Sequence, residues 1–383
     1  MKKSFSVSKP FISKDDIKDI KVVLKTGWIT YGPKSIELEE KVKNKIKSKN
    51  VIAVNSATSG IFISLVALGA KKGDEVLTPS NTYISTIHSI YNLGLKIKFC
   101  DVNIETGCVD ENIFRNNITK KTKFFIPVHY GGRPSNIKSI IKVANKLGIK
   151  IIEDAATALG SKTNGKFIGS YNGSVTVFSL HANKIITSGE GGLISTNNNN
   201  VAKKIRLLIN SGLSKDTWSR KKLKNYRILD AKLPGYKLNY NDILATIAIK
   251  QINKIDKIIS YREKLYNHYK KKLHDISKKK LINFPKLNPN NKNVYYNFEI
   301  LIKKSKKQRD LLANFLQRKK INTAIYYTPA HKHNFYIKKF KNLKLPNTNY
   351  YFERSLSLPF HNNLSFKDVN IITKQINNFF LNG

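Results

Sequence analysis

Residues 123–153 contain the pattern that decides the fold. The apolar run Lys123-Phe-Phe-Ile-Pro-Val128 is followed by Ile137-Lys-Ser-Ile-Ile-Lys-Val-Ala-Asn-Lys-Leu147 and then by Ile149-Lys-Ile-Ile-Glu153. Apolar residues recur every three or four positions in the middle stretch, which predicts a helix, and the short runs on either side predict buried strands. A strand, a helix and a second strand in this order are typical of a parallel α/β sheet.

The same alternation extends in both directions along the chain. Further strands are predicted at Val51–Val54, Glu75–Thr78, Lys96–Val102, Ser174–Ser179 and Gly192–Thr196, with helices at Thr58–Leu68 and around Ser85–Asn92. We therefore expect residues 50–200 to form a largely parallel sheet that is covered by helices on both faces.

The pattern changes on either side of this region. Asn241–Lys272 predicts one long amphipathic helix or two in succession, and the later segments predict a mixed α+β arrangement: strands at Asn297–Ile302 and Thr323–Tyr327 and helices at Gln308–Lys319 and Phe366–Phe380. The N-terminal segment predicts one helix, Lys14–Lys25, which ends at Gly27. We expect an N-terminal arm (1–30), a large domain (31–250) and a small C-terminal α+β domain (251–383).

Composition excludes several classes of protein. The chain has 383 residues, of which 40% are hydrophobic, and this excludes wholesale disorder. Its two cysteines, Cys100 and Cys108, exclude a disulfide scaffold and a zinc site built mainly from cysteines. No run of about 18 apolar residues predicts a membrane span, and no apolar segment behind the first lysines indicates a signal peptide. We expect a soluble, cytoplasmic protein that does not bind membranes.

The net charge of +44 is typical of proteins that bind nucleic acid through its phosphates. However, only nine of the 69 basic residues are arginines, the side chain suited to bidentate phosphate and base contacts, and the 60 lysines are spread along the whole chain. We interpret most of them as solvated surface and expect no specific nucleic-acid partner. Such a field would still attract an anionic substrate such as a nucleotide diphosphate.

Two polar segments lie where predicted strands end. Asp154 follows the strand Ile149–Glu153 and could either face a ligand at the edge of the sheet or cap the next helix. The second segment, Ser179-Leu-His-Ala-Asn-Lys184, places His181 and Lys184 in a turn. Partial burial there would lower the pKa of the lysine and make it a better nucleophile.

A third segment, Asn55-Ser-Ala-Thr58, lies between a strand and an apolar helix. The free N–H groups at such a helix start favour a phosphate, although Ser56 or Thr58 could simply cap the helix. Together the three segments fit pyridoxal phosphate, which needs a lysine for its Schiff base, a carboxylate for its ring nitrogen and a phosphate cup.

These segments and others, in this order, resemble the DegT/DnrJ/EryC/StrS-type pyridoxal-phosphate-dependent nucleotide-sugar aminotransferases along nearly the whole chain. Several look closest to the branch that makes UDP-4-amino-4-deoxy-L-arabinose. The resemblance implies a type I aminotransferase fold: a large domain with a mostly parallel seven-stranded sheet between helices and a smaller C-terminal α+β domain. The matching segments are Gly27-Trp-Ile-Thr-Tyr-Gly-Pro33, Asn55-Ser-Ala-Thr58, Gly73-Asp-Glu-Val76, Thr78-Pro-Ser-Asn-Thr-Tyr83, Pro127-Val-His-Tyr130, Glu153-Asp-Ala-Ala156, Ser179 to Lys184, Gly189-Glu-Gly-Gly192, Gly235-Tyr-Lys-Leu-Asn239 and Ser357-Leu-Pro359.

The resemblance implies a role for each residue of the cofactor site. Lys184 would form the Schiff base and later carry the proton, and Asp154 would pair with the ring nitrogen. The remaining cofactor contacts would be Tyr83 stacked on the ring, Ala57, Thr58 and Ser179 at the phosphate, and Asn239 reaching the same phosphate from the partner subunit of a homodimer.

Other residues are implied to contact the substrate. His181 and His331 would lie near the sugar, and Trp28 and Tyr31 would line the partner's site; for each of these, structural packing is the alternative. We expect no metal at His331 and His333, because no carboxylate or cysteine cluster accompanies them. Thr157 departs from the family, whose members often carry His, Gln or Glu there, near the cofactor's phenolic oxygen.

The expected reaction is ping-pong transfer of an amino group from glutamate, through Lys184, to the 4-keto group of a UDP- or dTDP-linked sugar. The product would be used for cell-surface polysaccharide or lipopolysaccharide. A 3-keto-sugar aminotransferase and a dehydratase of the same fold are alternatives, although a lysine at position 184 favours transamination. A non-catalytic, basic nucleic-acid-binding or regulatory protein on the same scaffold is the alternative from another class.

Overall fold

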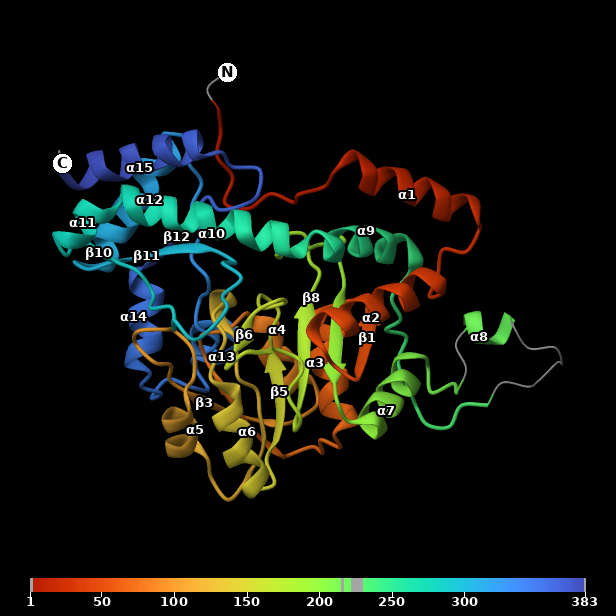
Figure 1. Cartoon of the computed structure of the whole chain (residues 1–383). Coiled ribbons are helices and arrows are strands. Elements are labelled where there is room, and N and C mark those ends of the chain that lie inside the picture. The colour runs from red at the N-terminus through yellow and green to blue at the C-terminus, as the bar shows by residue number, and fades with distance from the viewer. Residues whose placement is uncertain (1–2, 215–216, 222–229, 382–383) are drawn as a thin grey trace.

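The computed structural model describes residues 3–214, 217–221 and 230–381. At its centre lies a seven-stranded sheet with the strand order β1-β9-β8-β5-β4-β2-β3 (Figure 1). Only β9 runs antiparallel to its neighbours in this sheet, and the other adjacent pairs are parallel, as the sequence predicts. The strands are β1 (Asn50–Val54), β2 (Glu75–Pro79), β3 (Lys96–Cys100), β4 (Thr122–Phe125), β5 (Lys150–Asp154), β8 (Ser174–Ser179) and β9 (Gly192–Thr196).

Helices cover both faces of this sheet because alternate residues of each strand point to opposite sides. On β1, Val51 and Ala53 belong to one hydrophobic cluster, whereas Ile52 and Val54 belong to the other. The first cluster is closed by α2 (Pro33–Ile46), α5 (Glu111–Asn117), α6 (Ile137–Lys146) and α9 (Asp242–Asn253), and the second by α3 (Ala57–Ala67), α4 (Ile84–Asn92) and α7 (Asn199–Ile209).

A second sheet organises the C-terminal part of the chain. It is antiparallel, with the order β10 (Ile282–Asn283), β11 (Phe298–Ile302) and β12 (Ser355–Leu358). A third hydrophobic cluster joins it to α10 (Ile255–Lys272), α11 (His274–Lys278), α12 (Lys306–Arg318) and α15 (Phe366–Leu381). The predicted strand at Thr323–Tyr327 is wrong: Ala324 alone pairs with Ser357, and the chain then turns towards the large sheet. Pro329, which follows closely, cannot donate to a ladder.

The long helical segment is two helices in succession, α9 and α10, which run as one nearly continuous rod across the molecule (Figure 1). Apolar residues of α9 and of the first turns of α10 pack on the large sheet, whereas Leu265, Tyr266 and Tyr269 pack on the small one. The segment therefore connects the two cores. The proposed domain limits at residues 30 and 250 stay a prediction.

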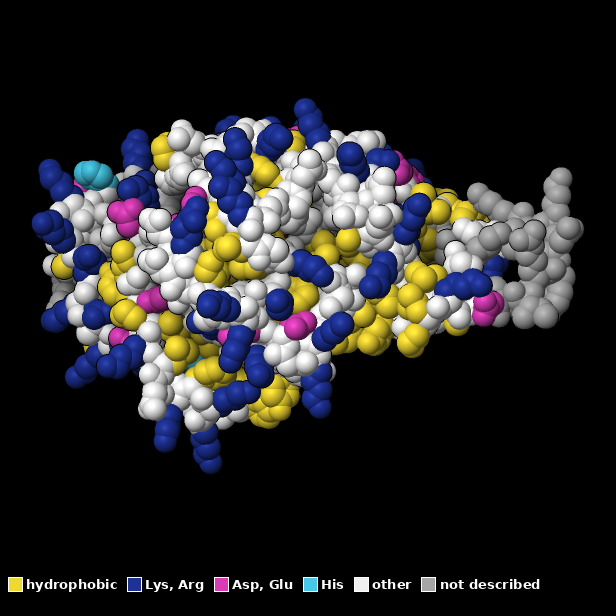
Figure 2. Space-filling model, turned by 90° about the horizontal axis from the view of Figure 1, so that it is seen from below, with side chains coloured by type: hydrophobic (Ala, Val, Ile, Leu, Met, Phe, Trp, Pro, Cys, Tyr) yellow, Lys and Arg dark blue, Asp and Glu magenta, His cyan; other side chains and the backbone are white. Residues whose placement is uncertain are grey.

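The remaining elements are short or peripheral. Helix α1 (Lys14–Lys25) has the predicted limits and packs beside α9. The others are the hairpin β6 (Lys162–Thr163) and β7 (Lys166–Phe167), the helices α8 (Thr217–Lys221), α13 (Asn334–Ile337) and α14 (Pro346–Arg354), and the 3-10 turns η1 (Tyr130–Gly132) and η2 (Ala330–Lys332). Lys and Arg side chains are scattered over the face shown in Figure 2, with apolar residues exposed between them.

The first turn of helix α2 is capped by a buried carboxylate from another helix. Its N-cap is Gly32, which has no side chain to satisfy the first N–H groups. Asp242 at the start of α9 does so instead, accepting from the N–H groups of Lys34 (3.0 Å) and Ser35 (2.8 Å) and from the Ser35 hydroxyl (2.8 Å). Because Asp242 is almost fully buried, water cannot replace it.

We expect Asp242→Ala to lower the free energy of unfolding by about 2–4 kcal/mol, because it leaves buried donors without an acceptor. Urea denaturation followed by circular dichroism measures this loss. Glu37→Ala is the matched control, since Glu37 lies on the same helix in a half-exposed pair with Lys34 and should cost less than about 0.5 kcal/mol. Equal losses in the two variants would contradict the interpretation.

Candidate active site

A cavity of about 550 Å³ lies where β5 and β8 end and α3 begins. In an α/β sheet this is the edge at which ligands bind. The three polar segments singled out in the sequence meet here. Of the predicted site residues, Ala57, Thr58, Tyr83, Asp154, Thr157, Ser179, His181 and Lys184 all line the cavity.

Lys184 supplies the only ammonium group among the described residues that line this cavity. It lies in the loop between β8 and β9, where its N–H donates to the His181 carbonyl oxygen (3.0 Å). Burial lowers the pKa of Lys184 to about 8, against the opposing attraction of the Asp154 carboxylate. About a tenth of the amine is therefore neutral, and nucleophilic, at pH 7, far more than for an exposed lysine.

Asp154 is the last residue of β5, and it lines the cavity. The Thr86 hydroxyl donates to Oδ2 (2.7 Å) and the Ala156 N–H to Oδ1 (3.2 Å), so both oxygens are oriented by neighbours. The Asp154 side chain is buried, and its own backbone N–H and carbonyl are held by Pro127 and His129. Such a fixed, desolvated carboxylate suits a cationic partner.

A buried histidine–glutamate pair supports the strand end on which Asp154 lies. The Ser135 N–H donates to His129 Nδ1 (3.0 Å), so the proton of the neutral ring is on Nε2, which donates to Glu153 Oε2 (2.9 Å). Glu153 also accepts from the Ser174 and Thr176 hydroxyls (2.6 and 2.8 Å). This network ties β5 to β8 and to the turn at residue 129.

The start of α3 fits a phosphate. Ser56 is the N-cap and accepts from the Ser59 N–H (3.0 Å), while Ala57 and Thr58, the first helical residues, face the cavity. The N–H groups of a helix's first turn have no partner within the helix, and the helix dipole favours an anion there. The Ser179 hydroxyl lies at the same cavity and accepts from the His181 N–H (3.2 Å), which leaves its proton for a ligand.

Thr157 faces the cavity, but its hydroxyl has structural partners. It donates to the His129 carbonyl oxygen (3.0 Å) and accepts from the Gly132 N–H (3.1 Å). Thr157 therefore fixes the turn at residues 129–132. Tyr83, at the N-cap of α4, is 58% exposed, so of the two side chains it is the one more available to a ligand.

Four predicted site residues do not line this cavity. His331 is buried with Nδ1 bonded to the Ser80 hydroxyl (2.7 Å), and burial lowers its pKa to about 4. Trp28 Nε1–H donates to the Tyr31 carbonyl oxygen (3.1 Å), and the Tyr31 hydroxyl lies beside Glu39. Asn239 bridges to Val54, and its Oδ1 is buried without a hydrogen-bond partner in the described part of the chain.

The model of the DegT/DnrJ/EryC1/StrS aminotransferase family matches residues 10–377. The chain belongs to this family. It is 36% identical over 368 residues to an uncharacterized protein of Methanocaldococcus jannaschii, a match that covers 94% of each chain. The expected family is thereby confirmed.

Solved structures confirm the type I aminotransferase fold. PseC of Helicobacter pylori, an aminotransferase involved in the biosynthesis of pseudoaminic acid, is 24% identical, with a TM-score of 0.89 over 100% of both chains. Spr1654 of Streptococcus pneumoniae is 25% identical in its PLP form, with a TM-score of 0.89 over 98% of both chains. The expected cofactor is thus present in the family, and the donors described above fit it.

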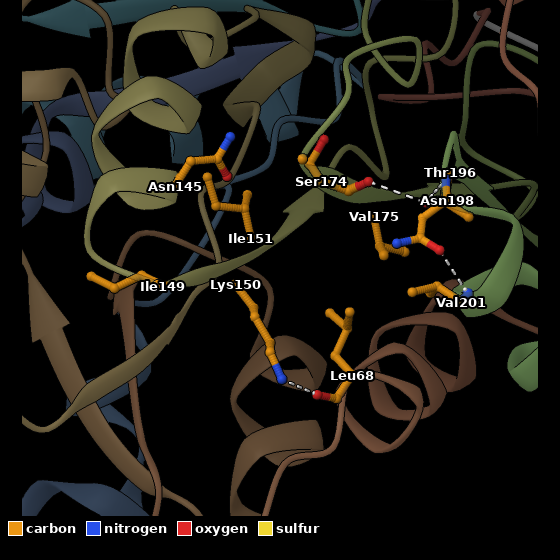
Figure 3. Close-up of a pocket in the computed structure, with 12 residues that line it drawn as sticks. Leu68, Asn145, Ile149, Lys150, Ile151, Ser174, Val175, Thr196, Asn198 and Val201 are labelled. Atoms are coloured by element: carbon orange, nitrogen blue, oxygen red, sulfur yellow. Dashed lines mark hydrogen bonds between the residues drawn. The ribbon is translucent and has the colours of Figure 1, made fainter.

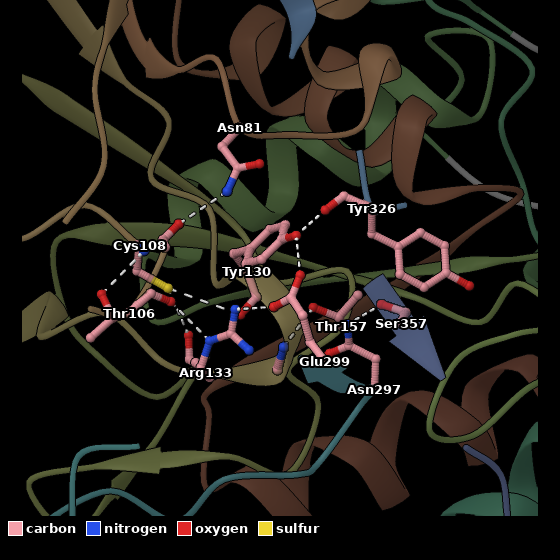
Figure 4. Close-up of polar contacts among 12 residues, drawn as sticks. Asn81, Thr106, Cys108, Tyr130, Arg133, Thr157, Asn297, Glu299, Tyr326 and Ser357 are labelled. Atoms are coloured by element: carbon pink, nitrogen blue, oxygen red, sulfur yellow. Dashed lines mark hydrogen bonds and ion pairs between the residues drawn. The ribbon is translucent and has the colours of Figure 1, made fainter. Parts of the chain in front are cut away.

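A buried network joins residues that are distant in the chain (Figure 4), and two of its members, Tyr130 and Tyr326, line the cavity. Glu299 on β11 accepts from Arg133 Nη2 (3.1 Å) and lies 2.9 Å from the Tyr130 hydroxyl. The Tyr130 hydroxyl also contacts the Tyr326 carbonyl oxygen. Burial raises the pKa of Glu299 although Arg133 opposes the shift.

The network holds Tyr326 and Tyr327 against the cavity, and sequence reasoning missed both as site residues. The Tyr327 ring packs edge-on to the Tyr83 ring, with centroids 5.6 Å apart. A signal was present in the sequence, because Tyr326 and Tyr327 precede by only a few positions His331, which was expected near the sugar.

No group of three or more His, Cys, Asp or Glu that could hold a metal occurs within the described ranges, and no described helix is long and apolar enough to cross a membrane.

A second cavity, of about 270 Å³, lies at the opposite ends of β5 and β8 (Figure 3). Its lysine, Lys150, donates to the Leu68 carbonyl oxygen (2.6 Å) at the end of α3, so this ammonium already has a structural partner.

We expect Glu299→Gln to lower the free energy of unfolding by about 3–5 kcal/mol, because it leaves the buried Arg133 guanidinium without a counter-charge. Denaturant titration gives the value. Glu105→Gln, which removes an exposed ion pair with Lys286, serves as the control and should change it by less than about 1 kcal/mol. If the Glu299→Gln protein is as stable as this control, the contacts of Glu299 with Arg133 and Tyr130 do not hold the two sheets together.

Proposed function

We propose that this chain is a pyridoxal-phosphate-dependent aminotransferase that moves an amino group from glutamate to the 4-keto group of a UDP- or dTDP-linked sugar. One observation carries the proposal: the Lys184 amine and the Asp154 carboxylate face one cavity beside a helix N-terminus. Family membership supports transamination, and PseC's part in pseudoaminic acid biosynthesis supports a sugar as the acceptor. The sugar would serve cell-surface polysaccharide or lipopolysaccharide synthesis in the cytoplasm.

When bound, pyridoxal phosphate supplies an electron sink for bond breaking at the α-carbon of the amino donor. Lys184 would hold the cofactor covalently and, once the donor displaces it, take a proton from the donor and return it at the neighbouring carbon. Its pKa of about 8 suits both steps, because the amine can accept a proton and release it near neutral pH. Asp154 would keep a proton on the ring nitrogen by charge pairing.

The other cavity residues would bind rather than react. The N–H groups of Ala57 and Thr58 and the Ser179 hydroxyl would hold the phosphate, and Tyr83 would cover the ring. His181, half exposed at the mouth beside Glu190, would meet the substrate. The hydroxyl of Thr157 is already bonded to the backbone, so we propose that Thr157 orders the turn at residues 129–132 instead of contacting the cofactor directly.

The alternatives differ in the reaction but share the site. A 3-keto-sugar aminotransferase would use the same residues, and a dehydratase would have to act with a lysine at position 184. A basic protein that binds nucleic acid has no use for the Lys184–Asp154 pair. The positive field of the chain instead suits the diphosphate of a nucleotide-linked sugar.

We propose that the active form is a homodimer in which Asn239 reaches the phosphate of the partner's site. One feature supports this: Asn239 does not line the cavity of its own chain. A phosphate accepts hydrogen bonds, so Asn239 would donate to it from its Nδ2 amide group. Trp28 and Tyr31 would line the partner's site from the same side, and His331 would lie near the sugar.

The proposed chemistry predicts the visible spectrum of the enzyme. The protein loaded with pyridoxal phosphate should show a yellow band that glutamate alone bleaches and that a 4-keto nucleotide sugar restores. Lys184→Ala should lose the band and all measurable turnover, and Asp154→Ala should keep bound cofactor but lose at least about 100-fold in rate.

The control is Lys166→Ala, which removes an exposed lysine and should behave as the wild type. A band that ignores glutamate would point to another donor or to dehydration. Restoration by a 3-keto sugar alone would establish the alternative aminotransferase, and a fully active Lys184→Ala protein would overturn the site.

A mixed-subunit experiment tests whether Asn239 acts in the partner's site of a homodimer. Asn239→Ala should weaken cofactor retention several-fold, because one phosphate contact is lost. Mixing Lys184→Ala subunits with Asn239→Ala subunits should restore up to about half of the wild-type activity per mixed dimer, because one of its two sites then has both residues intact. No recovery in a verified mixed dimer would place Asn239 in its own chain's site or outside both.

A further inference from the structure

Lys184 lies against an aromatic ring that the sequence did not single out. Its Nζ is 5.1 Å from the centroid of the Tyr296 ring, within the distance at which an ammonium group is attracted by the ring face. The Tyr296 side chain is only 4% exposed. Water can therefore reach this contact only from the side of the partly buried ammonium group, and such contacts are strongest when they are desolvated.

The position of Tyr296 is fixed from outside the cavity. Arg262, a buried residue of α10, donates from Nη2 to the Tyr296 carbonyl oxygen (2.6 Å) and from Nε to the Tyr295 carbonyl oxygen (2.8 Å). The same guanidinium is held by Asn362 Oδ1 (3.0 Å) and the Phe360 carbonyl oxygen (3.3 Å). Two of these four hydrogen bonds from a planar, rigid guanidinium thus anchor the backbone that carries the ring.

We propose that Tyr296 is a positioning residue that stabilises the ammonium form of Lys184 and so sets the pH at which this amine becomes a nucleophile. This inference rests on the proposed role of Lys184. The ring provides attraction without a second negative charge, which would hold the amine protonated far more strongly. It also gives the amine a fixed resting place whenever it is not bound to the cofactor.

Several groups act on Lys184 together with the ring. Burial lowers its pKa to about 8 and the Asp154 carboxylate opposes this shift. The other titratable side chains at the cavity include His181 and Glu190 of its own loop, Tyr83 on α4, and Tyr326 and Tyr327. Tyr296 adds to the effect of Asp154, since both favour the charged amine. Removing the ring should therefore lower the pKa of Lys184.

The test measures how fast the full chain, freed of cofactor, combines with added pyridoxal phosphate between pH 6 and 10. Only the neutral amine attacks the aldehyde, so the rate of appearance of the yellow band rises with pH around the pKa of Lys184. The wild type should reach half of its maximal rate near pH 8. Tyr296→Phe keeps the ring and should match the wild type, whereas Tyr296→Leu should shift the midpoint down by about one pH unit.

Tyr295→Leu is the matched control. Tyr295 is adjacent in sequence, but its hydroxyl donates to Glu263 Oε1 (2.7 Å) on α10, so the wild-type midpoint is expected. If the Tyr296→Leu chain does not fold, phenylalanine analogues with one, two and three ring fluorines at position 296 replace it. They keep the shape of the ring while weakening its negative face, and the midpoint should fall stepwise with each fluorine.

Two results would overturn the inference while leaving the proposed function intact. The first is a Leu or fluorinated variant with the wild-type midpoint, and the second is a Tyr296→Phe variant shifted as far as Tyr296→Leu, which would assign the effect to the hydroxyl. Absence of the yellow band in the wild type would instead overturn the role of Lys184, and this inference with it.

Discussion

The site depends on one interaction, between the Lys184 amine and the Asp154 carboxylate, which are held largely away from water at the same edge of the large sheet. Burial favours the neutral form of Lys184 and lowers its pKa, and the Asp154 carboxylate opposes this shift. Each group lessens the cost of burying the other, and the hydroxyl of Thr86 and the N–H of Ala156 orient the carboxylate further. The parallel strands make this possible, because their carboxyl ends bring β5 and the end of β8 to one place.

The small sheet contributes to the site at a distance. Glu299 on β11 fastens Tyr130 and Arg133, and the buried Arg262 fastens Tyr296. Both contacts link residues more than 30 positions apart, and both end at side chains beside the cavity. A buried charge whose hydrogen bonds are all satisfied allows little movement. The two cores are joined through these groups, and Tyr130 and Tyr296 beside the cavity are therefore held rigidly.

The sequence was informative where local pattern and chemistry coincide. Asp154, Lys184 and the start of α3 were found because each follows a recognisable strand, and the limits of β8, β9 and α1 were predicted to the residue. Tyr296 and Glu299 were missed because their importance arises from contacts between distant segments, which single-sequence patterns do not record. Thr323–Tyr327 has the composition of a strand, but after Ala324 the chain leaves the sheet edge to follow the cavity.

The reversed direction of β9 has a consequence for how this site can vary. Because β8 and β9 are antiparallel, residues 180–191 form a hairpin loop, closed at its base by the bonds from the Leu180 N–H to the Gly191 carbonyl oxygen and from the Ser188 N–H to the Leu180 carbonyl oxygen. Leu180, Ile185 and Ile186 of this loop are buried in the same hydrophobic cluster as Val51 and Ala53 of β1. An insertion or deletion around Lys184 would therefore displace side chains of the core. The lysine lies on a connection whose length is constrained by the packing beneath it.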